Sequence, residues 1–198
     1  MIYLHHTPLS KIVSTDARLT KTNRTIIHHY RHNILTAFCQ SHNLPTPIYD
    51  KQAFGKPFIT NSPLSFNQSH CVSDYVLAFS LTTPNIGVDI EHLGRQVKFE
   101  LLAKRCFHDD EYQLWQNNGH DKYLWFKLWT IKEAVLKAQG LGIRLNLNEL
   151  NAVFTRDNGG YVCHDKIGRF YFKNLLINEC MITLACPFDC DNMLIVLI

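Results

Sequence analysis

The chain has 198 residues, which is enough for one sizeable domain or two small ones. Hydrophobic residues make up 46% of the chain and charged residues 19%, a composition that favours an ordered globular protein over a disordered one. No apolar run approaches the length of a membrane span, and the first residues lack the apolar core of a secretory leader. A net charge of +3 falls short of the usual footprint of a duplex-binding domain, so we expect neither nucleic acid nor a membrane as partner.

Cysteine usage indicates a reducing compartment. The seven cysteines are an odd number, and no two of them form a Cys-x-x-Cys pair. The closest spacing, Cys186 to Cys190, is not that of a zinc knuckle. We therefore expect reduced thiols in a cytoplasmic protein.

The first half of the chain predicts one long helix followed by strands. Helical periodicity covers residues 22–42 and ends before Pro45 and Pro47. Strand patterns follow over residues 65–70, 75–81 and 85–91. A loop, Phe54-Gly55-Lys56-Pro57, lies between the helix and the first of these strands.

The second half repeats the order of helix and then sheet. Helices are expected over residues 97–107, 109–115 and 121–139, and Gly140 is placed to cap the last one. Strands are expected over residues 150–155, 161–164, 169–172, 180–185 and 193–197, with a hairpin turn at residues 157–160. We therefore predict an α+β fold of two similar lobes, residues 1–94 and 95–198.

Two short segments carry the chemistry. In the strand that includes Gly87, Asp89 and Glu91, the intervening residues are apolar, so both carboxylates face the same side of the strand. In the helix over residues 121–139, Glu133 and Lys137 lie one turn apart on one face. Three carboxylates and an ammonium on two rigid elements suit a hard divalent cation together with a phosphate.

A pocket is also expected beside this helix. The leucines and other apolar residues at positions 124, 128, 131, 135 and 138 form its core stripe. Phe126 and Trp129 lie on the opposite side, the side of Glu133 and Lys137. Aromatic residues next to an acid and a base favour a pocket wall over a merely solvated face.

These segments resemble the paired motif of the 4′-phosphopantetheinyl transferases. The strand Gly-Val-Asp-Ile-Glu is followed after about forty residues by Trp-Thr-x-Lys-Glu-Ala-x-x-Lys. Gly55-Lys56-Pro57 and the segment Phe66 to His70 are similar to two upstream blocks of that family, and Phe107 to Tyr112 is similar to the segment between the main motifs. Length and the repeated helix-to-sheet order resemble the subfamily in which one chain contains two fused pseudo-symmetric halves.

The resemblance implies transfer of the phosphopantetheine arm of coenzyme A to a serine of an apo acyl or peptidyl carrier protein, with release of adenosine 3′,5′-bisphosphate. It implies that Mg²⁺ is the cofactor and that Asp89, Glu91 and Glu133 are its ligands. Lys137 would act at the pyrophosphate, and Glu133, or Glu111 through a water molecule, would accept the serine proton.

The remaining implied contacts are with coenzyme A. They involve Lys56, Ser69 and His70, with Asp89 at the metal-bound end. Arg24, at the start of the first predicted helix, is the best candidate for a further phosphate contact, although a solvated arginine explains it almost as well. An internally duplicated chain has less need of a partner subunit, so we expect a monomer.

Two rival functions are compatible with parts of the sequence. A metal-dependent phosphohydrolase or nuclease would use the same three carboxylates, but it leaves Gly55-Lys56-Pro57 and the Ser69-His70 pair unexplained. An inactive carrier-binding module would not need all the acidic residues and Lys137. Lys98, Lys104 and Arg105 give the following region a basic character, suited either to docking an acidic carrier helix or simply to solvent.

Overall fold

The computed structural model describes residues 1–13, 21–140, 145–188 and 195–198 and shows an α+β fold. The four α-helices among the described residues are α1 (Lys21–Ser41), α2 (Phe99–Cys106), α3 (Asp109–Asn117) and α4 (Lys122–Gln139). The strands of the amino-terminal part are β1 (Ile2–Pro8), β2 (Tyr49–Lys51), β3 (Pro57–Ile59), β4 (Ser65–His70), β5 (Asp74–Ser80) and β6 (Gly87–His92). Those that follow α4 are β7 (Ala152–Arg156), β8 (Gly159–His164), β9 (Gly168–Ile177), β10 (Cys180–Cys186) and β11 (Ile195–Leu197).

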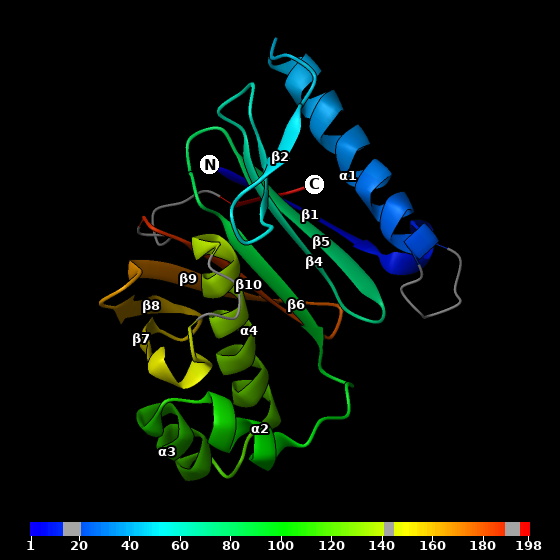
Figure 1. Cartoon of the computed structure of the whole chain (residues 1–198). Helices are drawn as coiled ribbons and strands as arrows, with labels where there is room; N and C mark the ends of the chain where they lie inside the picture. The colour runs from blue at the N-terminus through cyan, green and yellow to red at the C-terminus, as the bar shows by residue number, and fades with distance from the viewer. Residues whose placement is uncertain (14–20, 141–144, 189–194) are drawn as a thin grey trace.

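The first sheet has the strand order β11-β1-β5-β4. β5 is antiparallel to both β1 and β4, and β11 runs parallel to β1. Helix α1 covers one face of this sheet (Figure 1), and its buried residues Ile27, Leu35 and Cys39 share a core cluster with Leu77 and Phe79 of β5. The small hairpin of β2 and β3 lies beside this layer.

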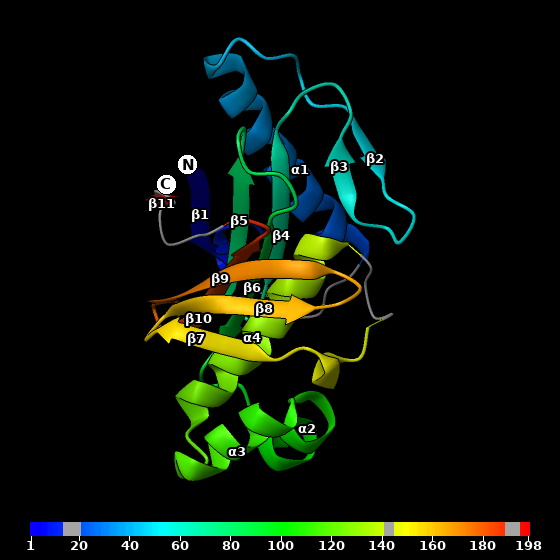
Figure 2. The same cartoon turned by 90° about the vertical axis from the view of Figure 1, so that its left-hand side faces the viewer.

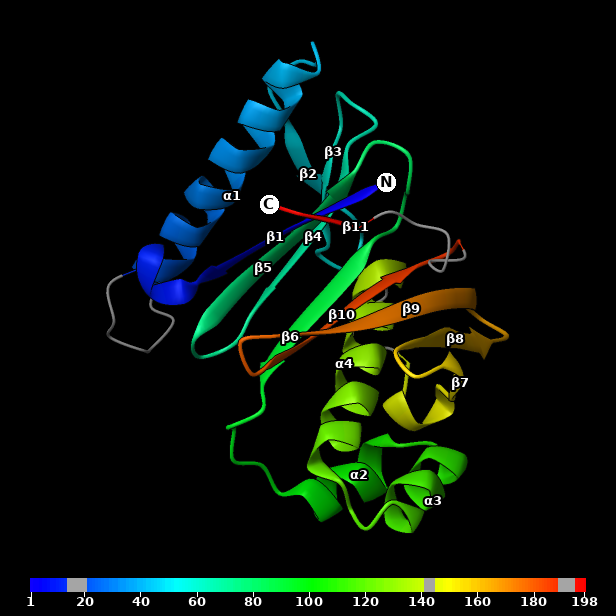
Figure 3. The same ribbon diagram turned by 180° about the vertical axis from the view of Figure 1, so that it is seen from behind.

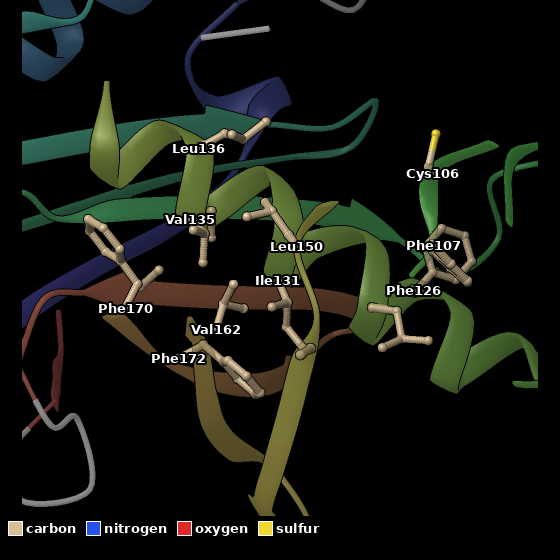
Figure 4. Packing of buried hydrophobic residues seen from close by; sticks show 14 of the residues in the cluster. Cys106, Phe107, Phe126, Ile131, Val135, Leu136, Leu150, Val162, Phe170 and Phe172 are labelled. Atoms are coloured by element: carbon tan, nitrogen blue, oxygen red, sulfur yellow. The ribbon is translucent and has the colours of Figure 1, made fainter. Parts of the chain in front are cut away.

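The second sheet has the order β6-β10-β9-β8-β7, and every neighbouring pair is antiparallel. Its strands cross α4, as Figure 2 shows. The helix packs against the sheet through residues such as Ile131 and Val135, which meet Val162 and Phe172 of the strands (Figure 4). Helices α2 and α3 cover the first turns of α4 (Figure 1).

The two sheets exchange strands across the predicted boundary at residue 94. β6 precedes that boundary but pairs with β10 of the second sheet, whereas β11 follows it but pairs with β1 of the first (Figure 3). The expectation that each half builds its own sheet is therefore wrong in this respect. The exchange has a physical benefit, because a buried cluster containing Val76, Val88 and Ile182 now fills the space between the sheets.

Most predicted elements are present close to their predicted bounds. The strand over residues 65–70 and the cap of α4 are confirmed: Gly140 has a left-handed φ of 84°, which glycine adopts without strain. Asp121 caps the start of α4 by accepting the Leu124 N–H at 2.7 Å. The short strands β2 and β3 were not predicted, and residues 193 and 194 of the last predicted strand lie outside the described residues. Within the described ranges, no helix is both long and apolar enough to cross a membrane.

Candidate active site

The strand β6 lies directly against helix α4, and Gly87 makes this approach possible. A Cβ atom at residue 87 would stand 1.9 Å from the carbonyl oxygen of Ala134 and 2.4 Å from the backbone nitrogen of Ala138. Only glycine fits such a contact. The contact fixes the position of β6 along the axis of α4. Asp89 lies two residues further along the same face of the strand, and the contact therefore places it beside the last turns of the helix.

Asp89, Ser69 and Lys137 form a closed hydrogen-bonded triangle. The Ser69 hydroxyl donates to Asp89 Oδ1 at 2.9 Å, and Lys137 Nζ donates both to that oxygen at 2.6 Å and to Ser69 Oγ at 2.8 Å. The three residues come from β4, β6 and α4. Three segments that the sequence predicted as one site are thus joined by direct contacts.

Glu91 and Glu133 flank this triangle and are electrostatically coupled to it. Burial, and next the negative charge of Asp89, raises the pKa of Glu91 to about 7. The same two causes, in the same order, raise the pKa of Glu133. Like charges raise one another's pKa only over short distances in a partly buried site, so the three carboxylates occupy one neighbourhood.

This neighbourhood fits a bound cation. Asp89 is 5% exposed, and its second oxygen, Oδ2, is buried and makes no hydrogen bond. A buried carboxylate oxygen without a donor is costly, and a hard cation would relieve that cost. Among the described residues, Asp89, Glu91 and Glu133 do not bring three ligand atoms within 4.8 Å of one another, and Arg95 pairs with Glu91 while Lys137 pairs with Asp89. Mg²⁺ retains several water ligands and needs only one or two carboxylates in direct contact.

Lys56 ties the Gly-Lys-Pro loop to both main motifs. Its ammonium donates to the carbonyl oxygen of Ala138 in α4 at 2.7 Å and to that of Ile86, just before β6, at 3.2 Å. Burial lowers the pKa of Lys56 to about 8. The side chain therefore holds the loop, the strand and the end of the helix together, in addition to presenting a charge.

A cavity of about 740 Å³ opens beside these residues. Its wall includes the Gly55-Lys56-Pro57 loop, Asn67 and Gln68 of β4, Glu133 and Lys137 of α4, Arg105 of α2, and residues 145–148. The volume is typical of a site for a nucleotide-sized ligand. Three basic side chains line the cavity, those of Lys56, Arg105 and Lys137, and they suit an anionic ligand.

His70 lies close to the same charges. Burial is the main cause that lowers the pKa of His70, followed by the positive charge of Lys137, with a smaller contribution from Arg24. Arg24 is exposed in the first turn of α1. Its charge reaches His70, which is consistent with a position near the site, but its predicted phosphate contact stays a prediction.

Glu111 is a predicted site residue that the structure places elsewhere. It is 1% exposed, and its carboxylate pairs with the fully buried Lys132 at 2.6 Å. Its two oxygens also accept the backbone N–H groups of Ala152 at 2.8 Å and His108 at 2.9 Å. Because both oxygens are buried, held by structural partners and outside the cavity lining, the structure does not place Glu111 as the predicted proton acceptor.

The predicted aromatic pocket wall is wrong, because neither Phe126 nor Trp129 lines the cavity. Phe126 is fully buried, and its ring packs against Phe99 of α2 at 5.9 Å between centroids. Trp129, one turn further along, stacks on Trp125 at 5.4 Å between ring centroids. Helix α2 covers the first turns of α4 on this face. The residues of α4 that line the cavity begin only at Glu133.

Sequence reasoning overlooked Asn67 as a functional residue. Its side-chain oxygen accepts the backbone N–H of Val88 at 3.0 Å, in a position where both residues are buried. β4 and β6 belong to different sheets, so this amide replaces the backbone ladder that would otherwise hold them together. The sequence contained a signal for it, because Asn67 lies in the segment Phe66 to His70 that resembles the family motif.

Comparison with known proteins gives a consistent result. The sequence profile of the 4′-phosphopantetheinyl transferase superfamily matches residues 85–181, which contain β6, α4 and the acidic residues described above. The 4′-phosphopantetheinyl transferase gsp of Aneurinibacillus migulanus is 32% identical over 111 residues, covering 54% of this chain and 44% of the relative. The 4′-phosphopantetheinyl transferase HetI of Nostoc sp. is 36% identical over 113 residues, covering 54% and 47%.

A longer match is found with the 4′-phosphopantetheinyl transferase psf-1 of Bacillus pumilus. It is 32% identical over 147 residues, covering 72% of this chain and 58% of the relative. The chain thus spans about half the length of the curated relatives it matches.

Proposed function

Because this chain belongs to the 4′-phosphopantetheinyl transferase superfamily, we propose that it transfers the 4′-phosphopantetheine moiety of coenzyme A to a serine of an apo acyl or peptidyl carrier protein. The observation that carries this proposal is the triangle of Ser69, Asp89 and Lys137, of which Lys137 lines an anion-suited cavity. The by-product of the transfer is adenosine 3′,5′-bisphosphate.

The bond changes define what the site must provide. The carrier serine oxygen forms a bond to the β-phosphorus of coenzyme A, and the bond from that phosphorus to the oxygen bridging it to the α-phosphorus breaks. The serine proton passes to a base, and the electron pair of the broken bond stays on the departing nucleotide. Negative charge therefore grows on the leaving phosphate oxygens and must be stabilised there.

Lys137 is placed to stabilise that charge. Its ammonium lies in the last turn of α4, is partly exposed, and borders the cavity. Asp89 and Ser69 fix the position of Nζ through the contacts of 2.6 and 2.8 Å. A fixed cation contributes more to a transition state than a mobile one, because little reorganisation is needed as charge develops.

Glu133 is the residue we assign to the serine proton. Its carboxylate borders the cavity, and burial raises its pKa in the metal-free site. A metal-bound oxygen is a weaker base, so the serine proton would go to the carboxylate oxygen that the ion leaves free. Glu111, the other candidate from the sequence, is fully committed to its buried ion pair. Glu133 therefore remains as the base from the predicted pair.

Mg²⁺ is the proposed cofactor, with Asp89, Glu91 and Glu133 as the residues that would hold it. When bound, the ion supplies charge neutralisation at the pyrophosphate. The basic residues Lys56 and Arg105, with Ser69, His70 and Arg24, are proposed to contact coenzyme A. A monomeric state and a cytoplasmic location also stay predictions.

The test is an incubation with coenzyme A, Mg²⁺ and an apo carrier protein, followed by measurement of the intact carrier mass. We expect a gain of one phosphopantetheine group with the unchanged chain and no gain with Glu133→Gln. Glu179→Gln is the matched control, because its side chain is 83% exposed and lies outside the cavity wall. Hydrolysis of coenzyme A with an unmodified carrier would instead support the hypothesis of a metal-dependent phosphohydrolase.

A further inference from the structure

Two cysteines and an aspartate converge where the first sheet meets the second. Cys71 follows β4, Asp74 opens β5, and Cys180 opens β10. The two Sγ atoms and a carboxylate oxygen of Asp74 all lie within 4.8 Å of one another. Within the described ranges this is the one group of three histidine, cysteine or acidic ligand atoms brought so close together.

The distances within this group suit a tetrahedral metal ion. Cys180 Sγ lies 3.3 Å from Asp74 Oδ2, and Cys71 Sγ lies 3.5 Å from the hydroxyl of Ser73. Zinc–sulfur bonds of about 2.3 Å and zinc–oxygen bonds of about 2.1 Å separate the corners of a tetrahedron by roughly 3.5 Å. The separation of Cys180 Sγ and Asp74 Oδ2 already matches this spacing, and Cys71 Sγ lies within 4.8 Å of the other two ligand atoms. Both cysteines are free thiols, so neither is committed to a disulfide.

Asp74 is oriented for this role by a neighbour on another strand. It is 7% exposed, and its Oδ1 lies 2.9 Å from Nε2 of His6 in β1, whose side chain is 10% exposed. This leaves Oδ2 directed at Cys180. Metal-binding carboxylates and histidines are commonly held in this way by a second polar group that does not itself touch the metal.

We propose that Cys71, Cys180 and Asp74 bind one divalent transition-metal ion of the zinc class. His6 orients Asp74, and the Ser73 hydroxyl, 4.0 Å from Cys180 Sγ, or a water molecule completes the fourth position. Each thiol releases its proton to solvent as its sulfur binds the metal. Thiolate ligands select zinc-class ions over magnesium, so this site differs in chemistry from the carboxylate site.

Binding at this position would stabilise the fold. The turn that contains Cys71 and Ser73 belongs to the first sheet, whereas Cys180 belongs to the second. A metal joined to both would add a link between two layers that are otherwise held mainly by apolar packing. An ion that binds the folded chain but not the unfolded chain raises the melting temperature, and the gain in free energy grows with the logarithm of the ion concentration above Kd.

The test uses the full chain, reduced and stripped of metal, titrated with Co²⁺ in the presence of excess Mg²⁺. We expect one equivalent of Co²⁺ to produce the near-ultraviolet absorption of thiolate bound to cobalt, and Zn²⁺ to abolish it and raise the melting temperature. Cys71→Ser should weaken binding at least about a hundredfold, more than the loss of an outer-shell partner usually costs. His6→Gln should weaken it by about 10- to 100-fold.

Two controls separate this site from others in the chain. Cys163→Ser removes an exposed thiol of β8 and should leave the absorption unchanged. Asp89→Asn alters the carboxylate site and should also leave it unchanged, so failure of the proposed transfer activity does not affect this result. Absence of the absorption in the unchanged chain, or its persistence in both Cys71→Ser and Cys180→Ser, would overturn the proposal. So would a Cys71–Cys180 disulfide in a protein that, once reduced, binds no Co²⁺.

Discussion

Lys137 Nζ lies 2.6 Å from Asp89 Oδ1, and this ion pair joins the end of helix α4 to the middle of strand β6. The two residues are 48 positions apart in the sequence. Gly87 brings their elements into contact, because only a residue without a side chain permits β6 to approach the backbone of Ala134 and Ala138. The geometry of the site therefore depends on one glycine as much as on the charged residues themselves.

Asp89→Asn should abolish most of the transfer activity while preserving the fold. The amide keeps the shape of the side chain but loses the charge that holds Lys137 and would hold the metal. We expect turnover to fall by about 10²- to 10³-fold, the scale typical of losing one electrostatic contact in an active site. Turnover and thermal unfolding should be measured together, with Lys127→Met, on the same helix and bonded to the Asp157 carbonyl, as control. Near-normal turnover in Asp89→Asn would refute its assignment.

Glu111→Gln should reduce stability rather than catalysis. It would leave the fully buried ammonium of Lys132 without its counter-charge, and breaking a buried ion pair from one side costs about 3–5 kcal/mol. The double variant Glu111→Gln with Lys132→Met should recover part of the lost free energy of unfolding, as measured by denaturant titration. Turnover per folded molecule should stay close to that of the unchanged chain. A selective loss of turnover at full stability would restore Glu111 as a catalytic residue.

Gly87→Ala should displace β6 and disrupt the site. The added methyl group would collide with the Ala134 carbonyl at 1.9 Å, and forced overpacking costs about 1–3 kcal/mol or more. We expect both a lower melting temperature and a large loss of turnover. Gly119→Ala is the comparison, because a Cβ there meets no atom within 4 Å and only its φ of 66° is strained. Equal effects at the two positions would contradict the close approach of β6 to α4.

Affinity for coenzyme A should weaken at alkaline pH through Lys56. Burial lowers the pKa of Lys56 to about 8, below its value in the unfolded chain, so the folded protein loses this charge as pH rises through 8. Loss of a cation weakens binding of an anion, so KM for coenzyme A should rise between about pH 7.5 and 9. Lys56→Arg, which stays charged, should show a smaller rise.

The lowered pKa of Lys56 also changes the free energy of unfolding, which should increase as pH rises while the affinity for coenzyme A falls. Between the folded pKa of about 8 and the higher pKa of the unfolded chain, the unfolded state binds more protons at Lys56 than the folded state does. This residue therefore favours folding increasingly as pH rises through that window. The free energy of unfolding of Lys56→Met should lack this contribution, and an identical pH profile in both proteins would exclude a lowered pKa for Lys56.

The sequence predicted the site residues that lie within short motifs, because each motif fixes its own local geometry. Alternation along β6 correctly placed Asp89 and Glu91 on one side, and helical spacing placed Glu133 beside Lys137. The family resemblance assigned Ser69 and Asp89 to the same site, but the hydrogen bond between them was not predicted. No periodicity relates β4 to α4, since the contact arises only when the layers pack.

The wrong and missed predictions have a common cause, which is long-range packing. Glu111 has the appearance of a surface acid next to a helix start, and only the fold reveals that Lys132 is buried beneath it. Phe126 shares a face with Glu133, but α2 covers that part of the helix. The exchange of β6 and β11 between sheets likewise depends on pairing between strands that are distant in sequence.

The most direct measurement of the central claim is the ratio of nucleotide released to carrier modified. The chain should be incubated with coenzyme A, an apo carrier and Mg²⁺, with adenosine 3′,5′-bisphosphate quantified by chromatography and the carrier by intact mass. We predict one nucleotide per modified carrier, and neither product when a chelator removes the magnesium. Nucleotide formed without carrier modification, or carrier bound without either product, would contradict the account.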